Sequence, residues 1–126
     1  PDTYVQDGDM ITLGGITFQC LFCPGHSPGS VAFYYENASS EPWTLVEGSK
    51  KVVLTSPLVI GGDALFAGSI GRTDFQGSSP SQLKESLRTK FMTLPDDTVL
   101  LSGHGPRTTI GTERNTNPYL LNMNQW

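Results

Sequence analysis

Three apolar segments of this chain each run into a glycine-rich turn that carries one residue of a metal-binding type. Glycine lets the backbone approach a site closely and adopt a positive φ. A turn held at the end of a strand also positions a side chain more rigidly than a mobile loop does. The three residues and the segments they follow are His26 after residues 16–22, Asp63 after residues 58–60, and His104 after residues 98–102.

The residue types alone are compatible with a metal site and with ordinary surface residues. Neutral imidazole binds Zn²⁺ or Fe²⁺, and a carboxylate can bridge two cations. His26, Asp63 and His104 are 37 and 41 residues apart along the chain, so that a cluster would form only in the folded protein. The alternative is that two loop histidines and an aspartate are ordinary surface residues.

The residue pattern predicts a single α/β (α+β) domain with a mixed or antiparallel sheet and few helices. Ser79 and Pro80 are typical of a helix start, and Leu83, Leu87 and Phe91 recur every four residues, so they predict one main amphipathic helix. A short helix is expected near residues 110–115, followed by a polar tail. The expected strands are residues 10–13, 16–22, 31–35, 58–60 with a continuation at 64–66, and 98–102.

Residues 36–43 are polar and rich in turn formers, which predicts an exposed loop. After them, residues 44–46 and 51–54 are expected to pair as a small hairpin around residues 47–50.

Charge and hydropathy exclude some partners. The chain has 126 residues, with 8 Lys and Arg against 12 Asp and Glu, and a net charge of −4. This charge disfavours nucleic acid and anionic membranes as partners. No apolar run approaches the roughly 20 residues that span a bilayer. We expect a cytoplasmic protein.

Cys20 and Cys23 form a C-x-x-C sequence, which is typical of a redox pair or of half a zinc site. No second C-x-x-C exists to complete four sulfur ligands. We therefore expect two buried thiols that pack against their neighbours.

Four motifs in order resemble the C-terminal half of a metallo-β-lactamase-fold hydrolase of the glyoxalase II (hydroxyacylglutathione hydrolase) type. The resemblance covers residues 1–126 as one partial domain, apart from residues 36–51, which look like an inserted loop or hairpin. The motifs are PGHSPGS at 24–30, GDALFAGSIGRTDF at 62–75, LPDDT at 94–98, and GHGP at 103–106 followed by TTIG at 108–111 and NP at 117–118.

This resemblance implies half of a four-layer αββα sandwich with a site for two divalent metal ions, Zn or alternatively Fe or Mn, at its edge. His26 matches a histidine ligand of the first metal, Asp63 the catalytic aspartate that bridges both metals, and His104 the last histidine of the second metal. The implied reaction is thioester hydrolysis, in which a metal-bridged hydroxide attacks the carbonyl carbon of a small-molecule thioester.

The chain also departs from the family. The signature His-x-His-x-Asp-His is absent, so three of the seven expected ligands are present, and this chain alone is expected to be incomplete and inactive. The missing half would precede Pro1 or come from another protein chain, and a homodimer is a further arrangement. Without that half, we expect an apolar face of the sheet to be uncovered.

Two other functions stay open. The segment GRTDFQ at 71–76 also resembles persulfide dioxygenases, which share the fold and use one iron and O₂. The other alternative is an inactive truncated fragment of the fold. Arg72 is a candidate for substrate binding, although a structural ion pair with Asp74 is the favoured interpretation.

Overall fold

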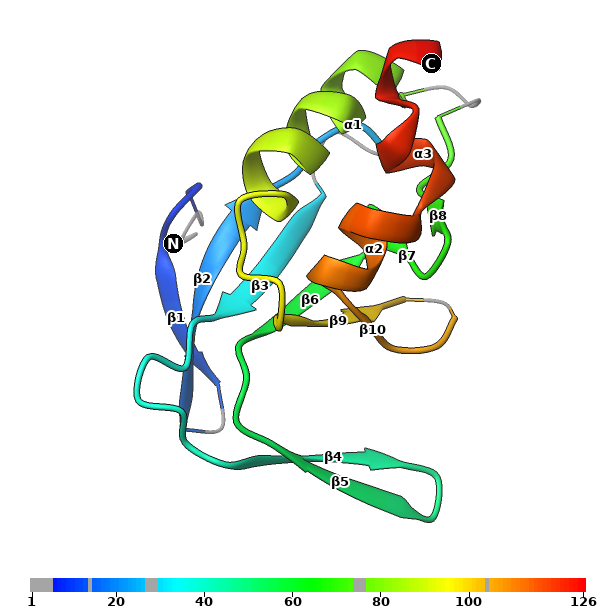
Figure 1. Cartoon of the computed structure of the whole chain (residues 1–126). Helices are drawn as coiled ribbons and strands as arrows, with labels where there is room; N and C mark the ends of the chain where they lie inside the picture. Colours follow the sequence, from blue (N-terminus) through cyan, green and yellow to red (C-terminus); the bar gives the residue numbers. More distant parts are fainter. Residues whose placement is uncertain (1–5, 14, 27–29, 74–76, 104) are drawn as a thin grey trace.

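A six-stranded mixed sheet forms the centre of the molecule (Figure 1). The structure, a computed structural model, describes residues 6–13, 15–26, 30–73, 77–103 and 105–126. The strand order is β1-β2-β3-β6-β9-β10, in which β6 and β9 run parallel and the other neighbours run antiparallel. The strands are β1 (Met10–Leu13), β2 (Ile16–Phe22), β3 (Val31–Tyr35), β6 (Leu58–Gly62), β9 (Val99–Ser102) and β10 (Thr108–Thr109).

The helices cover one face of this sheet (Figure 1). Alternate residues of a strand point to opposite faces, so that Ala32, Val59 and Leu100 all lie on the helical side. They form the main core with α1 (Pro80–Ser86), α2 (Ile110–Thr116) and the residues around them.

The main helix begins as the sequence predicts. The Ser79 side chain accepts a hydrogen bond from the Gln82 amide at 3.2 Å, and Pro80 occupies the first turn. The helix continues as one π-helical turn, Leu87–Phe91, in which the Met92 amide bonds to the Leu87 carbonyl. Its predicted apolar residues, Leu83, Leu87 and Phe91, are fully buried, and losing a side chain as large as Phe91 would cost about 3–5 kcal/mol.

The tail contains more structure than its polarity predicts. After α2, the structure has α3 (Pro118–Leu121) and a short 3₁₀ turn, Met123–Gln125. Asn117 caps α3 through its side chain, and Pro118 fills the first helical position. An Asn-Pro pair is a recognisable helix start, so this signal was present in the sequence.

The opposite face of the sheet carries an aromatic cluster. Phe18 contacts Phe33 and Tyr35 edge to face, with ring centroids 6.5 and 6.2 Å apart. Ile60 lies on the same side of β6 as Leu58 and is 38% exposed. The helices therefore protect one side of the sheet better than the other, as expected for half of a sandwich.

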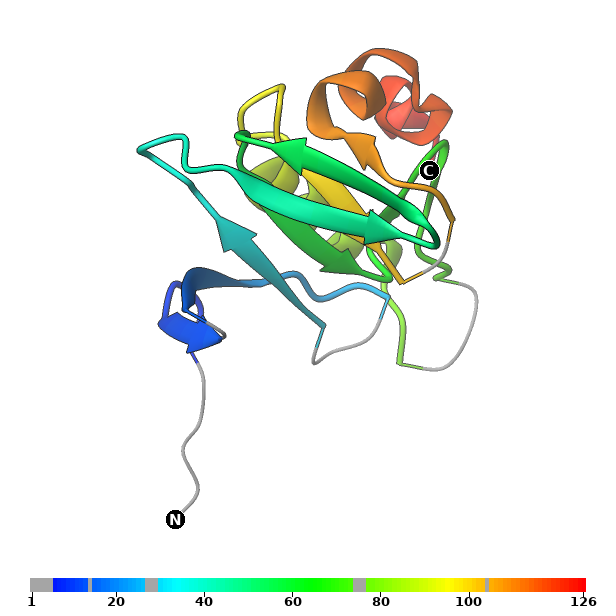
Figure 2. The same cartoon turned by 90° about the horizontal axis from the view of Figure 1, so that it is seen from below.

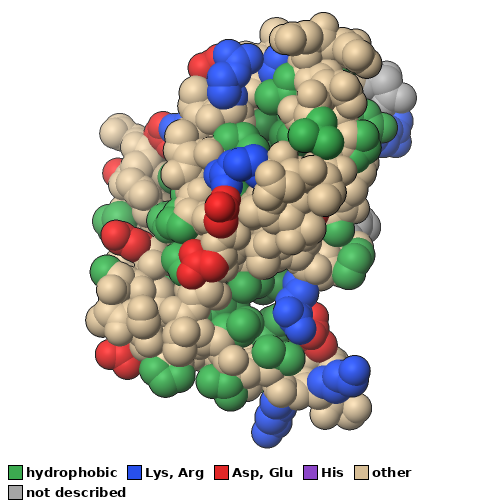
Figure 3. All heavy atoms as spheres, in the orientation of Figure 1, with side chains coloured by type: hydrophobic (Ala, Val, Ile, Leu, Met, Phe, Trp, Pro, Cys, Tyr) green, Lys and Arg blue, Asp and Glu red, His purple; other side chains and the backbone are tan. Residues whose placement is uncertain are grey.

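The hairpin of β4 (Trp43–Glu47) and β5 (Lys50–Leu54) starts beside this second face and extends away from the central sheet beyond its base (Figure 1 and Figure 2). Trp43 and Leu54 at its base pack on the aromatic cluster. Figure 3 shows hydrophobic side chains over the hairpin region and basic side chains near its free end. The hairpin predicted at residues 44–54 is confirmed. Each strand extends one residue further toward the turn than expected, to Glu47 in β4 and to Lys50 in β5, and β4 also begins one residue earlier, at Trp43.

One strand prediction differs from the structure. Residues 64–66 do not continue β6 but begin a separate hairpin, β7 (Leu65–Phe66) and β8 (Ser69–Ile70). The chain turns between β6 and β7 because Gly62 has a φ of +57° and the Ala64 amide bonds back to the Gly61 carbonyl at 3.3 Å.

Among the described residues, no helix combines the length and the apolar character that crossing a membrane requires.

Candidate metal centre

The loop that carries His26 is held against helix α1. The Ser86 hydroxyl donates a hydrogen bond to the Pro24 carbonyl at 2.7 Å, and the Ser79 amide donates to the Gly25 carbonyl at 2.7 Å. Gly25 has a φ of +142°, and a Cβ on it would lie 2.3 Å from the backbone of Leu83. Only glycine fits this contact, so helix α1 fixes the position from which the His26 side chain extends.

Asp63 follows directly after β6, at the edge where β6 and β9 end side by side. The register of these strands shifts between Ile60 and Gly62, which turns the following residues relative to the sheet. The Gly103 amide donates to the Gly62 carbonyl at 2.8 Å, and a Cβ on Gly103 would lie 2.8 Å from Asp63 Oδ1. The end of β9 therefore lies against the carboxylate of Asp63.

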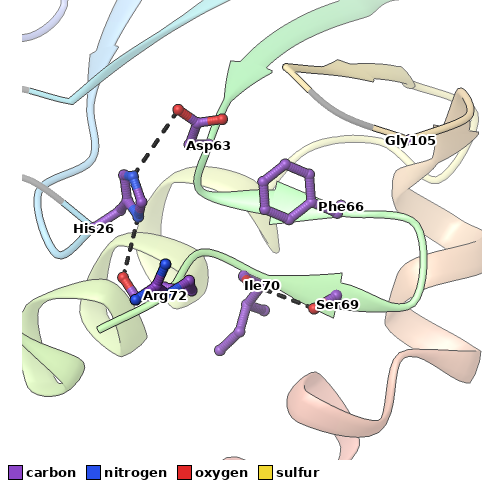
Figure 4. A pocket seen from close by; sticks show the side chains of 7 residues that line it. All are labelled: His26, Asp63, Phe66, Ser69, Ile70, Arg72 and Gly105. Carbon is purple, nitrogen blue, oxygen red and sulfur yellow. Dashed lines mark hydrogen bonds and ion pairs between the residues drawn. The ribbon is translucent and has the colours of Figure 1, made fainter. Parts of the chain in front are cut away.

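The imidazole of His26 lies between a backbone carbonyl and this carboxylate (Figure 4). Its Nδ1 is 3.0 Å from the Arg72 carbonyl oxygen, and its Nε2 is 3.9 Å from Asp63 Oδ2. A carbonyl only accepts hydrogen bonds, so Nδ1 carries a proton, and Nε2 is the ring nitrogen that faces Asp63. Metal-binding histidines are commonly oriented in this way by a carbonyl that accepts from the other ring nitrogen.

The pair fits a divalent cation. Metal–nitrogen and metal–oxygen distances are each about 2.0–2.2 Å, so two ligands of one ion stand about 3.3–3.6 Å apart at a tetrahedral angle and at most about 4.4 Å apart. The separation of 3.9 Å between His26 Nε2 and Asp63 Oδ2 lies within this limit. Their side chains are 26% and 44% exposed, which leaves both accessible from solvent.

The third predicted ligand, His104, lies outside the described residues. In the part of the chain that the structure describes, no group of three or more His, Cys, Asp or Glu side chains is arranged to hold a metal. The structure thus brings together two of the three sequence-predicted residues, His26 and Asp63.

A cavity of about 500 Å³ opens beside this pair (Figure 4). Arg72, the candidate substrate-binding residue, lies on its wall, and so does Gly105, which follows His104 in the sequence. The lining residues are His26, Asp63, Phe66, Ser69, Ile70, Arg72 and Gly105.

The sequence did not predict the backbone role of two residues. The Arg72 carbonyl orients His26, whereas the sequence pattern indicates a role only for the Arg72 side chain. A Cβ on Gly71 would lie 2.2 Å from the Asp63 carbonyl oxygen and 3.1 Å from the His26 Cβ. The run of glycines around Asp63 was the available signal, but sequence does not say which atoms a glycine approaches.

The two cysteines do not take part in this site. Both thiols are free and buried, as the sequence predicts. Burial raises the pKa of Cys23 from its ordinary value of 9.0 to about 11, which keeps the thiol protonated at neutral pH. A protonated thiol is a poor metal ligand.

Comparison with known proteins gives a consistent picture. No family model matches the chain. The chain is 40% identical over 121 residues to the probable metallo-hydrolase YqgX of Bacillus subtilis, and equally to the hydroxyacylglutathione hydrolase GloC of Haemophilus influenzae. Each alignment covers 95% of this chain and 49% of the relative. The chain therefore spans about half the length of the curated relatives it matches.

Solved structures agree in fold. The BLEG-1 B3 metallo-β-lactamase matches with a TM-score of 0.74 and 38% identity, over 94% of this chain and 48% of that one. TTHA1623 in a di-iron-bound form gives a TM-score of 0.68 and 39% identity over 95% and 49%. ETHE1 from Myxococcus xanthus gives 0.72 and 32% over 92% and 44%. The chain therefore has the metallo-β-lactamase fold and corresponds to the C-terminal half of its metallo-hydrolase relatives.

Proposed function

We propose that this chain supplies the C-terminal ligands of a metal-dependent hydrolase that cleaves small-molecule thioesters of the hydroxyacylglutathione type. His26, Asp63 and His104 are the proposed ligands of two divalent ions, with Asp63 shared between them. The observation that carries the proposal is the pairing of His26 with Asp63 at 3.9 Å, with a proton of His26 held on Nδ1 by the Arg72 carbonyl.

Each described residue has a defined task in this proposal. The Arg72 carbonyl keeps Nε2 of His26 turned toward Asp63. The Asp63 carboxylate supplies the negative charge that a pair of cations needs. Divalent cations bound there would lower the pKa of a water molecule and so supply a nucleophile near neutral pH. The side chain of Arg72, on the cavity wall, would orient the substrate.

The remaining ligands would come from an N-terminal half, either in the same protein or in another chain. Residues 1–126 would then be a single partial domain, with residues 36–51 as an insertion. The half-covered second face of the sheet, with Phe18, Phe33 and Tyr35, supports this arrangement because such an apolar face is stabilised by a covering layer.

Metal content and turnover in the protein at its natural length test the proposal. Metal would be counted by elemental analysis, and hydrolysis of S-lactoylglutathione would be compared with hydrolysis of a β-lactam. We expect His104→Ala to lower metal content and thioester hydrolysis together. Asp63→Asn should lose the second metal first, because a neutral amide does not bridge two cations. Full activity of His104→Ala, or unchanged metal content of Asp63→Asn, would contradict the ligand assignment.

A mononuclear iron dioxygenase acting on persulfides is the second candidate, favoured by the sequence GRTDFQ at 71–76 and by the likeness to ETHE1. It predicts one iron per chain and O₂ consumption in the same preparations. A protein that binds no metal and turns over neither substrate would instead be an inactive fragment of the fold.

A further inference from the structure

We propose that Glu113 and Asn117 are positioning residues of the candidate metal centre. Together they form what we call the Glu113–Asn117 clamp, which holds the β7–β8 hairpin and, through it, both Asp63 and His26. The catalytic meaning of the clamp rests on the function proposed above. Its structural part stands on hydrogen bonds within this chain.

Glu113 is a carboxylate buried in the protein interior, with 2% of its surface exposed. It accepts hydrogen bonds from the Gly68 amide at 2.8 Å, the Thr108 hydroxyl at 2.7 Å and the Asn117 side-chain amide at 2.9 Å. Burying a carboxylate is costly unless it is hydrogen-bonded in this way. Gly68 lies in the turn between β7 and β8, so Glu113 of α2 is joined directly to the hairpin turn.

Asn117 completes the attachment. Its side-chain amide also donates to the Ser69 carbonyl at 3.1 Å and approaches the Phe66 carbonyl at 3.4 Å. Its side-chain oxygen faces the other way and accepts from the Tyr119 and Leu120 amides at the start of α3. One fully buried side chain thus joins both strands of the hairpin to the C-terminal helices.

The hairpin connects the two residues of the candidate centre. Asp63 lies just before β7, and Arg72, whose carbonyl orients His26, lies just after β8. The Gly71 amide closes the base of the hairpin on the Ala64 carbonyl at 2.9 Å. A movement of the hairpin would therefore displace Asp63 and the hydrogen-bond partner of His26 together.

The hairpin depends on the clamp because its own strands are short. Each strand has two residues, and an isolated two-stranded hairpin is only marginally stable in water. Phe66, Ser69 and Ile70 of this hairpin line the cavity beside the candidate centre. The clamp would accordingly fix one wall of the cavity as well as the ligand geometry.

The test removes the side-chain amide of Asn117, which donates to the hairpin, and keeps its side-chain oxygen, which accepts from α3. Asn117→Asp keeps the side-chain oxygen that caps α3 and removes the amide that holds the hairpin. Asn37→Asp is the matched control. Asn37 is 7% exposed, and its side-chain amide donates to the Glu41 and Thr55 carbonyls and reaches the Ser56 carbonyl, at the base of the β4–β5 hairpin.

Two measurements on the protein at its natural length separate the outcomes. Hydrogen exchange of the Gly68 and Gly71 amides is measured in metal-free protein, and cobalt(II) affinity is measured by absorption. We expect Asn117→Asp to accelerate that exchange and to weaken cobalt binding, each by about tenfold or more. The buried acceptors lose their donor, and the new carboxylate repels the carboxylate of Glu113, to which the Asn117 amide is bonded. Asn37→Asp should leave both quantities at the wild-type value.

The clamp is overturned if Asn117→Asp leaves exchange and affinity unchanged, or if Asn37→Asp changes them equally. Should Asn117→Asp not fold, Thr108→Val removes one donor to Glu113 without changing side-chain size, and the same two results are required of it. A wild-type protein that binds no cobalt would contradict the proposed function, while the exchange comparison would still decide whether the clamp holds the hairpin.

Discussion

Gly71 lies directly on Asp63, so closely that a Cβ on Gly71 would stand 2.2 Å from the Asp63 carbonyl oxygen. The same Cβ would stand 3.1 Å from the Cβ of His26. Neither neighbour is the flexible end of a side chain, so the backbone itself would have to move. The absence of a side chain at residue 71 is therefore part of what brings His26 and Asp63 together.

Gly71→Ala should destabilise the protein and reduce metal affinity together. Overpacking typically costs about 1–3 kcal/mol, and here the displaced atoms belong to both proposed ligand residues. Urea unfolding and metal titration would measure the two effects. Gly15→Ala is the control. It strains the turn before β2, where Gly15 has a φ of +84°, at the end of that strand away from His26. It should cost about 1–2 kcal/mol and leave metal affinity unchanged. Equal metal affinities for wild type and Gly71→Ala would contradict this prediction.

Gly103→Ala should act differently, because the atom it meets is movable. Its Cβ would lie 2.8 Å from Asp63 Oδ1, the end of a side chain that can rotate away. We expect a stability loss below about 1 kcal/mol, since rotation relieves the contact. Metal affinity should fall all the same, because the rotated carboxylate no longer faces His26 Nε2. A variant with reduced stability and unchanged metal affinity would show that this carboxylate orientation is unimportant.

Sequence patterns predicted the regular elements well where side-chain periodicity decides the structure. The spacing of Leu83, Leu87 and Phe91 matches one buried helix face, and the Ser79-Pro80 pair marks its start. The first three strands have the expected bounds. In these elements, local propensity and burial favour the same conformation.

The sequence could not predict the contacts between backbone atoms around the candidate centre. His26 and Asp63 were identified from their residue types and their turns, but the Arg72 carbonyl has no sequence signature. The β7–β8 hairpin was missed because two-residue strands are too short to show an alternating pattern. Its position depends on Glu113 and Asn117, more than forty residues later in the chain.

Stability should fall at alkaline pH through the thiol of Cys23. Burial raises the pKa of Cys23 in the folded protein from 9.0 to about 11. Because this pKa is raised, the protonated Cys23 thiol makes its full contribution to the free energy of unfolding below about pH 9. The contribution is lost as the pH rises toward 11, and the loss reaches up to about 3 kcal/mol. Urea unfolding at about pH 8 and about pH 10.5 would measure this loss.

Cys23→Ala is the control for that measurement, and it should show a smaller loss between the two pH values. Burial also raises the pKa of Cys20, so part of the dependence should remain in the variant. If both thiols only pack, blocking them after partial unfolding and refolding should leave the metal content as it was. Metal release on thiol modification, or an unchanged pH dependence in Cys23→Ala, would count against this assignment.

The ion pair between Glu47 and Arg107 should stabilise the β4–β5 hairpin only weakly. Arg107 Nε lies 3.0 and 3.1 Å from the two carboxylate oxygens of Glu47, which joins the hairpin to the loop before β10. Both side chains are more than one third exposed, so solvent screens their attraction. A double-mutant cycle with Glu47→Gln and Arg107→Gln should give a coupling free energy of about 0.2–1 kcal/mol, which decreases in about 1 M salt.

The Glu85–Arg88 pair, at 3.6 Å and with side chains about 60% exposed, is the reference for this measurement and should give a smaller coupling free energy. A Glu47–Arg107 coupling above about 2 kcal/mol would mean that this contact is buried in the protein at its natural length.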